Sequence, residues 1–260
     1  TLCCGQAFRW EKRGDWWFGV VNEKILMTRQ VGDLLQFLIQ PKKANTDFVT
    51  SYFRLADDLP TIYSKITKDK HVREAVKQFR GLRLLRQESW ECLISYLCAT
   101  NKNIPAIKDM INNLCKLFGK RLTLNTESFF TFPKPEALAE ASVKELKMCK
   151  LGFRAERIKQ TAKLVNEKAF DLEALKKMNY EDAKEELLTL PGVGPKVADC
   201  VLLFSLDKLE AFPIDVWMKR IISENYSSHF ERSFVEKIAV RKSITWREYE
   251  IINSFGRKYF

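Results

Sequence analysis

The sequence has few metal-binding side chains and no cysteine spacing that is typical of a metal site. His71 and His229 are the only histidines among 260 residues, and the seven cysteines include no Cys-x-x-Cys pair. Structural zinc sites commonly draw on such pairs. Residues 201–260 contain no cysteine, which excludes a four-cysteine iron–sulfur cluster in that region. We therefore expect no metal and no cofactor.

Long apolar runs and targeting signals are also lacking. No apolar run approaches the roughly 18 residues that a membrane span needs, so we expect no membrane partner. The first residues lack the basic-then-apolar pattern of a secretion signal. An odd number of irregularly spaced cysteines favours reduced thiols. These features predict a cytoplasmic location, or a nucleoid one in a prokaryote.

Positive charge, in contrast, is abundant. Lys and Arg number 44 against 33 Asp and Glu, which gives a formal net charge of +11. A surplus of this size indicates an anionic partner, most often nucleic acid, although it says nothing about the fold. The 46% apolar and 30% charged residues are typical of a globular protein, and the length suits one or two domains.

The spacing of apolar residues changes along the chain from strand-like to helix-like. Alternation and turn residues predict four short antiparallel strands at 6–10, 16–21, 24–28 and 33–39. From about residue 45 the spacing becomes helical. It predicts helices around 90–97, 107–118 (ended by Gly119), 135–146, 154–170, 180–188 and 196–206, with three or four helices between 195 and 258. We expect an α+β, mainly helical protein. Its N-terminal antiparallel sheet and short helices would occupy residues 1–80, and a helical domain residues 81–260.

The most informative segment is Leu190-Pro191-Gly192-Val193-Gly194-Pro195-Lys196, which separates two predicted helices. Glycine permits a positive φ and brings bare backbone to a surface, and proline suits the first turn of a helix. The second helix therefore begins with free N–H groups beside a glycine turn, which forms an anion site that fits a DNA phosphate. This is the helix–hairpin–helix pattern, over about residues 180–207, with Gly192, Val193 and Gly194 at the DNA. An ordinary helical corner is the alternative, and the motif alone indicates only sequence-independent duplex binding.

Lys196 stands in the first turn of the second hairpin helix, which is apolar on nearly every side. Burial and the positive end of the helix dipole both disfavour the ammonium form. Lowering the pKa of a lysine from about 10.4 to about 7 needs about 4–5 kcal/mol. We expect desolvation and the helix dipole to supply that, and the result would be an amine nucleophile.

Asp215 follows 19 residues later, just before another predicted helix. Its simplest role is to cap that helix. The same position lets a fixed carboxylate face a sugar carbon that becomes cationic, where it would stabilise an oxocarbenium-like transition state and help to move protons. The two roles are compatible.

These motifs together resemble the helix–hairpin–helix DNA glycosylases, and specifically their 8-oxoguanine DNA glycosylase branch. The resemblance extends over most of the chain in the right order. It rests on residues 190–200 and 211–216, and on the segments 5–10, 81–87, 101–104 and 151–155.

The resemblance implies a bifunctional enzyme that acts on double-stranded DNA containing oxidised guanine, and we expect a monomer. The damaged base would be flipped out of the duplex. Lys196 would attack C1′ and release the base, and β-elimination from the resulting Schiff base would nick the strand. Asp215 would be the electrostatic and proton-handling partner.

Further roles are implied residue by residue. Gly5 would read the oxidised base through its carbonyl, Cys200 would pack on one face of that base, and Phe255 would stack on it within a pocket that also includes Trp217. Asn101, Phe153 and Arg154 would contact DNA at and opposite the vacated site.

The sequence also departs from the pattern of this branch. Ala106 stands where a second cytosine-reading arginine is expected, so we expect little preference for cytosine opposite the lesion. Phe153 replaces a tyrosine and Trp217 replaces a histidine. Ile251 stands where a glutamine would contact the base edge.

Two other functions remain open at this stage. One is a glycosylase of the same superfamily that removes another base, such as an alkylated purine; Lys196 argues against a purely hydrolytic mechanism of that kind. The other is a non-catalytic module that binds duplex DNA, which explains the charge and the hairpin but gives no reason for Lys196 and Asp215.

Overall fold

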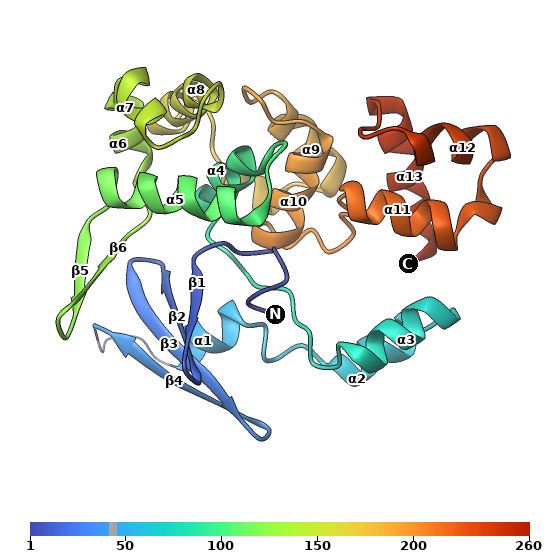
Figure 1. The fold of residues 1–260 in the computed structure, drawn as a ribbon, viewed down its shortest axis with the longest axis horizontal. Helices are drawn as coiled ribbons and strands as arrows, with labels where there is room; N and C mark the ends of the chain where they lie inside the picture. The colour runs from blue at the N-terminus through green and yellow to red at the C-terminus, as the bar shows by residue number, and fades with distance from the viewer. Residues whose placement is uncertain (42–45) are drawn as a thin grey trace.

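A computed structural model describes residues 1–41 and 46–260 (Figure 1). Four antiparallel strands form a meander in the order β1-β2-β3-β4, with β1 at Trp10–Arg13, β2 at Trp16–Val21, β3 at Lys24–Val31 and β4 at Leu34–Gln40. Three short helices follow, α1 (Thr46–Tyr52), α2 (Leu59–Ile66) and α3 (Lys70–Gln78). The sheet lies at one end of the molecule, below a larger group of helices.

The helical body begins with α4 (Ser89–Ala99) and α5 (Ile104–Phe118). It continues through the hairpin strands β5 (Arg121–Leu124) and β6 (Glu127–Phe130) to α6 (Pro135–Glu140), α7 (Val143–Met148), α8 (Arg154–Asn166), the 3-10 helix η1 (Ala174–Lys177), α9 (Tyr180–Leu188) and α10 (Pro195–Ser205). The C-terminal elements are α11 (Val216–Asn225), the 3-10 helix η2 (Ser227–His229), α12 (Arg232–Val240) and α13 (Trp246–Tyr259). The expected mainly helical protein with a small N-terminal antiparallel sheet is confirmed.

Three groups of buried apolar side chains stabilise this arrangement. The first lies under the sheet and includes Trp10, Leu26, Tyr52 and Leu85. The second fills the body around α4, which is almost wholly buried, and it also includes Phe8. The third lies among α11, α12 and α13. Because Leu85 packs with the sheet, a boundary at residue 80 stays a prediction.

The first strand differs from expectation. The predicted strand at 6–10 contributes only Trp10 to β1, and residues 6–9 are outside the sheet. Gly5 has φ +86, which is outside the strand region. The buried side chain of Gln6 holds this segment in place, because its amide nitrogen donates to Arg83 O (3.0 Å) and its oxygen accepts from Leu85 N (2.8 Å).

Two further differences concern the helical body. The predicted helix at 135–146 is two helices, since Ser142 caps α7 through a capping box with Glu145 and so begins a new helix. The hairpin of β5 and β6 was not predicted. Gly119 does end α5, yet its φ is −84 and it needs no left-handed backbone; a side chain there would collide with the carbonyls of Thr131 and Cys115.

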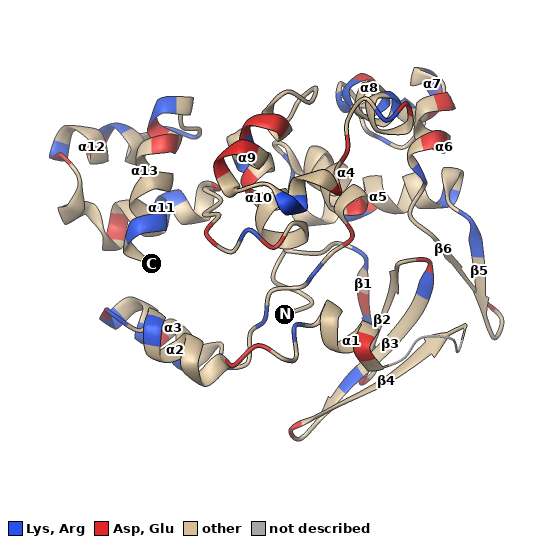
Figure 2. Cartoon of the chain, turned by 180° about the vertical axis from the view of Figure 1, so that it is seen from behind, with Lys and Arg blue, Asp and Glu red and all other residues tan. Residues whose placement is uncertain are grey.

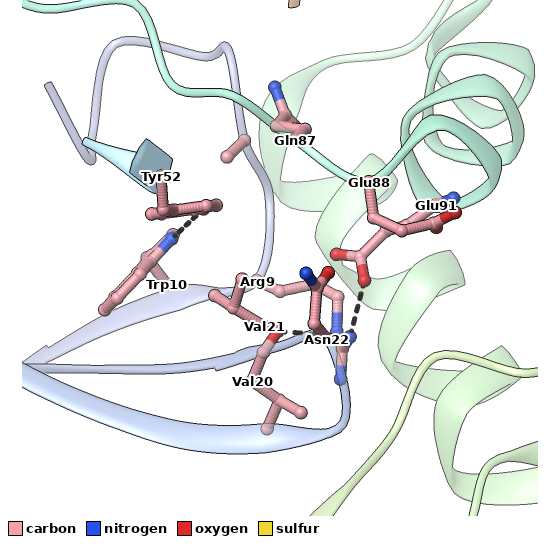
Figure 3. A pocket seen from close by; sticks show the side chains of 10 residues that line it. Arg9, Trp10, Val20, Val21, Asn22, Tyr52, Gln87, Glu88 and Glu91 are labelled. Atoms are coloured by element: carbon pink, nitrogen blue, oxygen red, sulfur yellow. Dashed lines mark hydrogen bonds and ion pairs between the residues drawn. The ribbon is translucent and has the colours of Figure 1, made fainter. Parts of the chain in front are cut away.

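The sheet and the body are joined by a partly buried ion pair. Arg9 precedes β1, and its guanidinium lies 2.9 Å from a carboxylate oxygen of Glu91 on α4 (Figure 3). Burial opposes the charged form of Arg9, but Glu91 holds the pKa of the guanidinium above its usual value. Arg9 also donates to Phe130 O at the end of β6. The sheet is therefore fixed to both α4 and the hairpin. Among the described residues, no helix is both long enough and apolar enough to span a membrane.

Candidate active site

The hairpin between α9 and α10 has the geometry that its glycines predict. Gly192 has φ +82, a conformation that side chains rarely adopt, and Val193 N donates to Leu190 O (3.1 Å) to close the turn. Gly194 is the N-cap of α10 without a side-chain cap, and Pro195 opens the helix. The N-terminus of α10 is therefore bare backbone beside an exposed turn, which suits a phosphate.

Lys196 lies in the first turn of α10 and is half-buried. Its amine is 5.5 Å from the centre of the Tyr96 ring, at the distance of a cation–π contact. Tyr96 comes from α4 and stacks on Phe204 of α10, with ring centres 5.8 Å apart and planes 9° apart. The packing of α4 against α10 thus places an aromatic face beneath the amine.

Cys200 lies one turn after Lys196 on α10 and is 3% exposed. Burial raises the pKa of its thiol to about 12, an effect that the Lys196 amine opposes and that Asp199 and Asp215 reinforce. Cys200 is therefore a neutral thiol. Because Lys196 and Asp215 both act electrostatically on it, the three predicted residues share one neighbourhood.

Asp215 is the N-cap of α11, and this predicted role is confirmed. Its carboxylate accepts from Trp217 N (3.0 Å) and Met218 N (2.8 Å), and the side chain is exposed. These bonds fix the carboxylate at a helix start, where it remains accessible to a ligand.

Gly5 approaches the same site through Tyr96. The Tyr96 hydroxyl lies 3.5 Å from Gly5 O and 3.3 Å from Gln6 O, so one side chain contacts both the N-terminal loop and the Lys196 amine. Sequence reasoning missed Tyr96 and Gln6. The available signal for Gln6 was its position next to Gly5. For Tyr96 there was no local signal, because α4 also contains Ser89, Glu91 and Ser95.

The three residues expected at the vacated site in DNA also come together. Asn101 follows α4 with φ +52 and is exposed. Arg154 donates to Thr100 O, next to Asn101, and to Leu151 O (3.3 Å). Phe153 is 56% exposed at the start of α8, and its ring centre lies 4.3 Å from the Arg154 guanidinium.

Arg154 is turned inward, with only 4% of its side chain exposed. Burial lowers the pKa of its guanidinium. Reading a base would require Arg154 to leave its carbonyl partners, whereas Phe153 already points outward. The base-reading role of Arg154 stays a prediction.

The ring contacts of Phe255 and Trp217 are with other side chains than Lys196 and Cys200, although the Trp217 backbone N–H bonds Asp215. The Phe255 ring packs against Phe230 (4.9 Å) and His229 (5.0 Å) in the C-terminal aromatic cluster. Trp217 is 64% exposed and lies under the Arg220 guanidinium. Their roles in a base pocket also stay predictions.

Among the described residues, two cavities lie away from Lys196. One, beside Arg9, Trp10 and Tyr52, has a volume of about 20 Å³, which is room for a water molecule and not for a purine (Figure 3). The other is an open depression of about 410 Å³ between Asp58, Tyr63 and Arg83. Within the described ranges, no group of three or more His, Cys, Asp or Glu side chains is arranged to hold a metal ion.

Positive and negative side chains lie on different helices next to the hairpin. Figure 2 shows Lys and Arg along α8 and carboxylates along α9. Arg157 of α8 lies directly against the hairpin, since a Cβ on Gly192 would meet Arg157 Cδ at 2.5 Å. A duplex on this side of the molecule would therefore approach from α8 and the turn, away from the acidic face of α9.

The fold and the site together define a duplex-binding helix–hairpin–helix protein with an amine beside its anion site. Two family models match the chain, namely the N-terminal domain of 8-oxoguanine DNA glycosylase at residues 1–93 and the HhH-GPD superfamily of base excision DNA repair proteins at residues 94–240. The chain belongs to the HhH-GPD superfamily, within its 8-oxoguanine glycosylase branch.

Characterised proteins and solved structures agree with this assignment. An N-glycosylase/DNA lyase of Saccharomyces cerevisiae is 32% identical over 93% of this chain and 71% of its own length. The apo 8-oxoguanine glycosylase/lyase of Clostridium acetobutylicum is 31% identical and superposes with a TM-score of 0.83, over 98% of this chain and 88% of that one. The same enzyme in complex with double-stranded DNA, which contains cytosine opposite 8-oxoguanine, is 29% identical over 98% and 89% of the two chains, with a TM-score of 0.81.

Proposed function

We propose that this protein is a DNA-repair glycosylase that excises 8-oxoguanine from duplex DNA and then cleaves the strand as a lyase. The observation that carries the proposal is the position of Lys196, directly after the hairpin and within one neighbourhood with Asp215 and Cys200. The similarity to glycosylase/lyases over nearly the whole chain supports it. The predicted monomeric state and cytoplasmic or nucleoid location remain part of the proposal.

The chemistry begins when the damaged nucleotide rotates out of the duplex, because C1′ is inaccessible inside the stack. The free amine of Lys196 forms a bond to C1′ as the bond from C1′ to the base breaks, and the base leaves with the electron pair. The carboxylate of Asp215, which accepts hydrogen bonds from two backbone N–H groups, opposes the positive charge that develops on the sugar.

Strand cleavage follows from the same covalent bond. Loss of a proton from the nitrogen and opening of the bond from C1′ to the ring oxygen give a Schiff base. In its protonated form this group makes the C2′ hydrogens acidic. Removal of one of them breaks the bond from C3′ to its oxygen, and the strand is nicked 3′ to the lesion.

Borohydride trapping tests the proposal. The protein is incubated with duplex containing 8-oxoguanine and then reduced. We expect a covalent adduct in the wild type and none in Lys196→Gln, because glutamine has no nucleophilic amine. We expect Asp215→Asn to lose at least about 100-fold in excision rate while it still binds DNA.

Three outcomes would contradict the proposal. Base release without an adduct would indicate a hydrolytic relative, and release only from duplex containing an alkylated purine would indicate another substrate. Tight binding with intact DNA would indicate a non-catalytic module.

A further inference from the structure

We propose that Asp199 is a positioning residue that ties the helix carrying Lys196 to the segment carrying Asp215, an inference that rests on the proposed function. Asp199 lies on α10, three residues after Lys196, and its side chain is fully buried. A buried carboxylate is costly unless its oxygens are hydrogen-bonded. Its partners therefore indicate what it stabilises.

Three neutral donors converge on this carboxylate from two other helices. On α13, the Tyr249 hydroxyl donates to Oδ2 (2.6 Å) and the Asn253 amide donates to the same oxygen (2.9 Å). On α9, the Tyr180 hydroxyl donates to Oδ1 (2.6 Å). The Lys184 amine adds positive charge 3.6 Å from Oδ2. One side chain of α10 thus holds both neighbouring helices.

The protons of this network remain on the tyrosines. Burial raises the pKa of Asp199 above its usual value, although Lys184 and the two hydroxyls oppose this. Burial and the adjacent Asp199 raise the pKa of Tyr249 far above its usual value. The phenols are therefore donors, and the carboxylate is their shared acceptor.

The two α13 side chains continue from Asp199 to the segment that ends at Asp215. Ile214 N donates to the Tyr249 hydroxyl (3.3 Å), and the Asn253 amide also donates to Phe212 O (2.9 Å). These two bonds flank Pro213, whose ring fixes its own φ. Asp215 follows Ile214 directly, so the backbone that leads to Asp215 is held on both sides of the proline.

Side-chain packing keeps this segment from sliding along α13. The Phe212 ring lies so close to Gly256 that a side chain at Gly256 would collide with it. The ring also stacks on Phe260, with centres 5.4 Å apart and planes 10° apart. The hydrogen bonds therefore act on a segment that has little freedom of its own.

The consequence concerns the geometry of the reaction. Lys196 and Asp215 lie on different elements, and the path from Asp199 through Tyr249 to Ile214 is a hydrogen-bonded connection between them. A displacement of about 1 Å at a reacting group can cost about 100-fold in rate. Loss of this connection should therefore slow the chemistry without changing the DNA-binding surface.

A matched pair of variants tests the connection. Tyr249→Phe removes the hydroxyl that joins Asp199 to Ile214. Tyr180→Phe removes a hydroxyl that bonds the same carboxylate at the same distance but does not contact the 212–215 segment. We avoid Asp199→Asn, because the asparagine amide would face the hydrogen-bond donors of Tyr249 and Asn253, and this conflict would destabilise the fold.

We expect Tyr249→Phe to lower the single-turnover excision rate by about 10-fold or more, and Tyr180→Phe by less than about 3-fold. Affinity for a duplex with an abasic-site analogue should stay the same in both.

A double variant distinguishes positioning from general loss of structure. If Tyr249 acts through Asp215, Tyr249→Phe should have little further effect in an Asp215→Asn background, because coupled changes are not additive. An undiminished effect in that background, or equal rates for Tyr249→Phe and Tyr180→Phe, would overturn this inference alone. Absence of turnover by the wild type would overturn the proposed function and the inference with it.

Discussion

At the scale of single residues, Tyr96 is the side chain that assembles the site. Its ring lies under the Lys196 amine, and its hydroxyl approaches the carbonyls of Gly5 and Gln6. A base held by Gly5 would therefore lie near the proposed nucleophile. Burial raises the pKa of the Tyr96 hydroxyl well above its usual range, so it remains a hydrogen-bond donor at physiological pH.

The two hairpin glycines should respond differently to substitution. Gly192 has φ +82 and faces Arg157, whereas Gly194 has φ −106 and open space around the position of a Cβ. A side chain in the left-handed region costs about 1–2 kcal/mol. We expect Gly192→Ala to lower both the melting temperature and the affinity for undamaged duplex.

The control for this prediction is Gly194→Ala, which should retain the melting temperature of the wild type. Circular dichroism and a fluorescence binding titration measure the two quantities. Equal losses in the two variants would contradict the role assigned to Gly192.

At the scale of elements, α13 is the helix that links the segment before Asp215 to Asp199, because it carries both Tyr249 and Asn253. It also carries Phe255. A capping box begins this helix, in which Thr245 N donates to Glu248 Oε2 (2.8 Å). Lys237 and Arg241 contact the other carboxylate oxygen at 3.2 and 3.1 Å. Glu248 thus links the start of α13 to the end of α12.

Because of these contacts, the stability of the C-terminal helices should fall at acidic pH. The hydrogen bond from Thr245 N, together with Lys237, holds the pKa of Glu248 below its usual value although burial opposes this. The unfolded chain therefore binds a proton more readily than the folded one, so stability rises with pH in this window. The stabilisation is present above about pH 4.5 and is lost as the pH falls through the lowered pKa.

We expect Glu248→Gln to melt at a lower temperature than the wild type at neutral pH, and this difference to vanish as the pH falls below the lowered pKa of Glu248. Thermal unfolding followed by circular dichroism measures this difference. The comparison with the variant isolates Glu248, because other carboxyl groups titrate in the same range. A constant difference between the two proteins from about pH 7 to about pH 3 would exclude the carboxylate as its cause.

At the scale of the whole molecule, the net charge of +11 is the main long-range force toward DNA. Each phosphate neutralised in a duplex contributes about −0.9 to the slope of log affinity against log salt. Arg157 lies against Gly192 at the hairpin and is exposed. We expect Arg157→Gln to reduce this slope by about 1 for undamaged duplex.

Arg232 provides the matched control. It is also exposed, but it lies on α12, which is separated from α8 and the hairpin in both views (Figures 1 and 2). We expect the slope for Arg232→Gln to equal that of the wild type. A change of similar size in both variants would indicate a diffuse electrostatic effect rather than a phosphate contact at the hairpin.

The sequence was most informative where function depends on local chemistry. The string around Gly192 and Lys196 predicted the hairpin, the helix start and the nucleophile from neighbouring residues, and the family and fold class that it indicated are confirmed. It failed where long-range contacts decide the conformation. The strand at 6–10 is replaced by a loop because Gln6 bonds residues almost 80 positions away, and the β5–β6 hairpin was missed.

Sequence alone thus determined the types of chemical group that we propose this protein brings to DNA: two glycines, a lysine at a helix start and an aspartate that caps the next helix. Tertiary structure decided how these groups are held. The inward turn of Arg154 toward Thr100, the Tyr96 ring under Lys196 and the buried carboxylate of Asp199 all depend on partners from distant segments. The physical reason is that a polar side chain is buried only where folding brings its hydrogen-bond partners to it, and local sequence does not specify those partners.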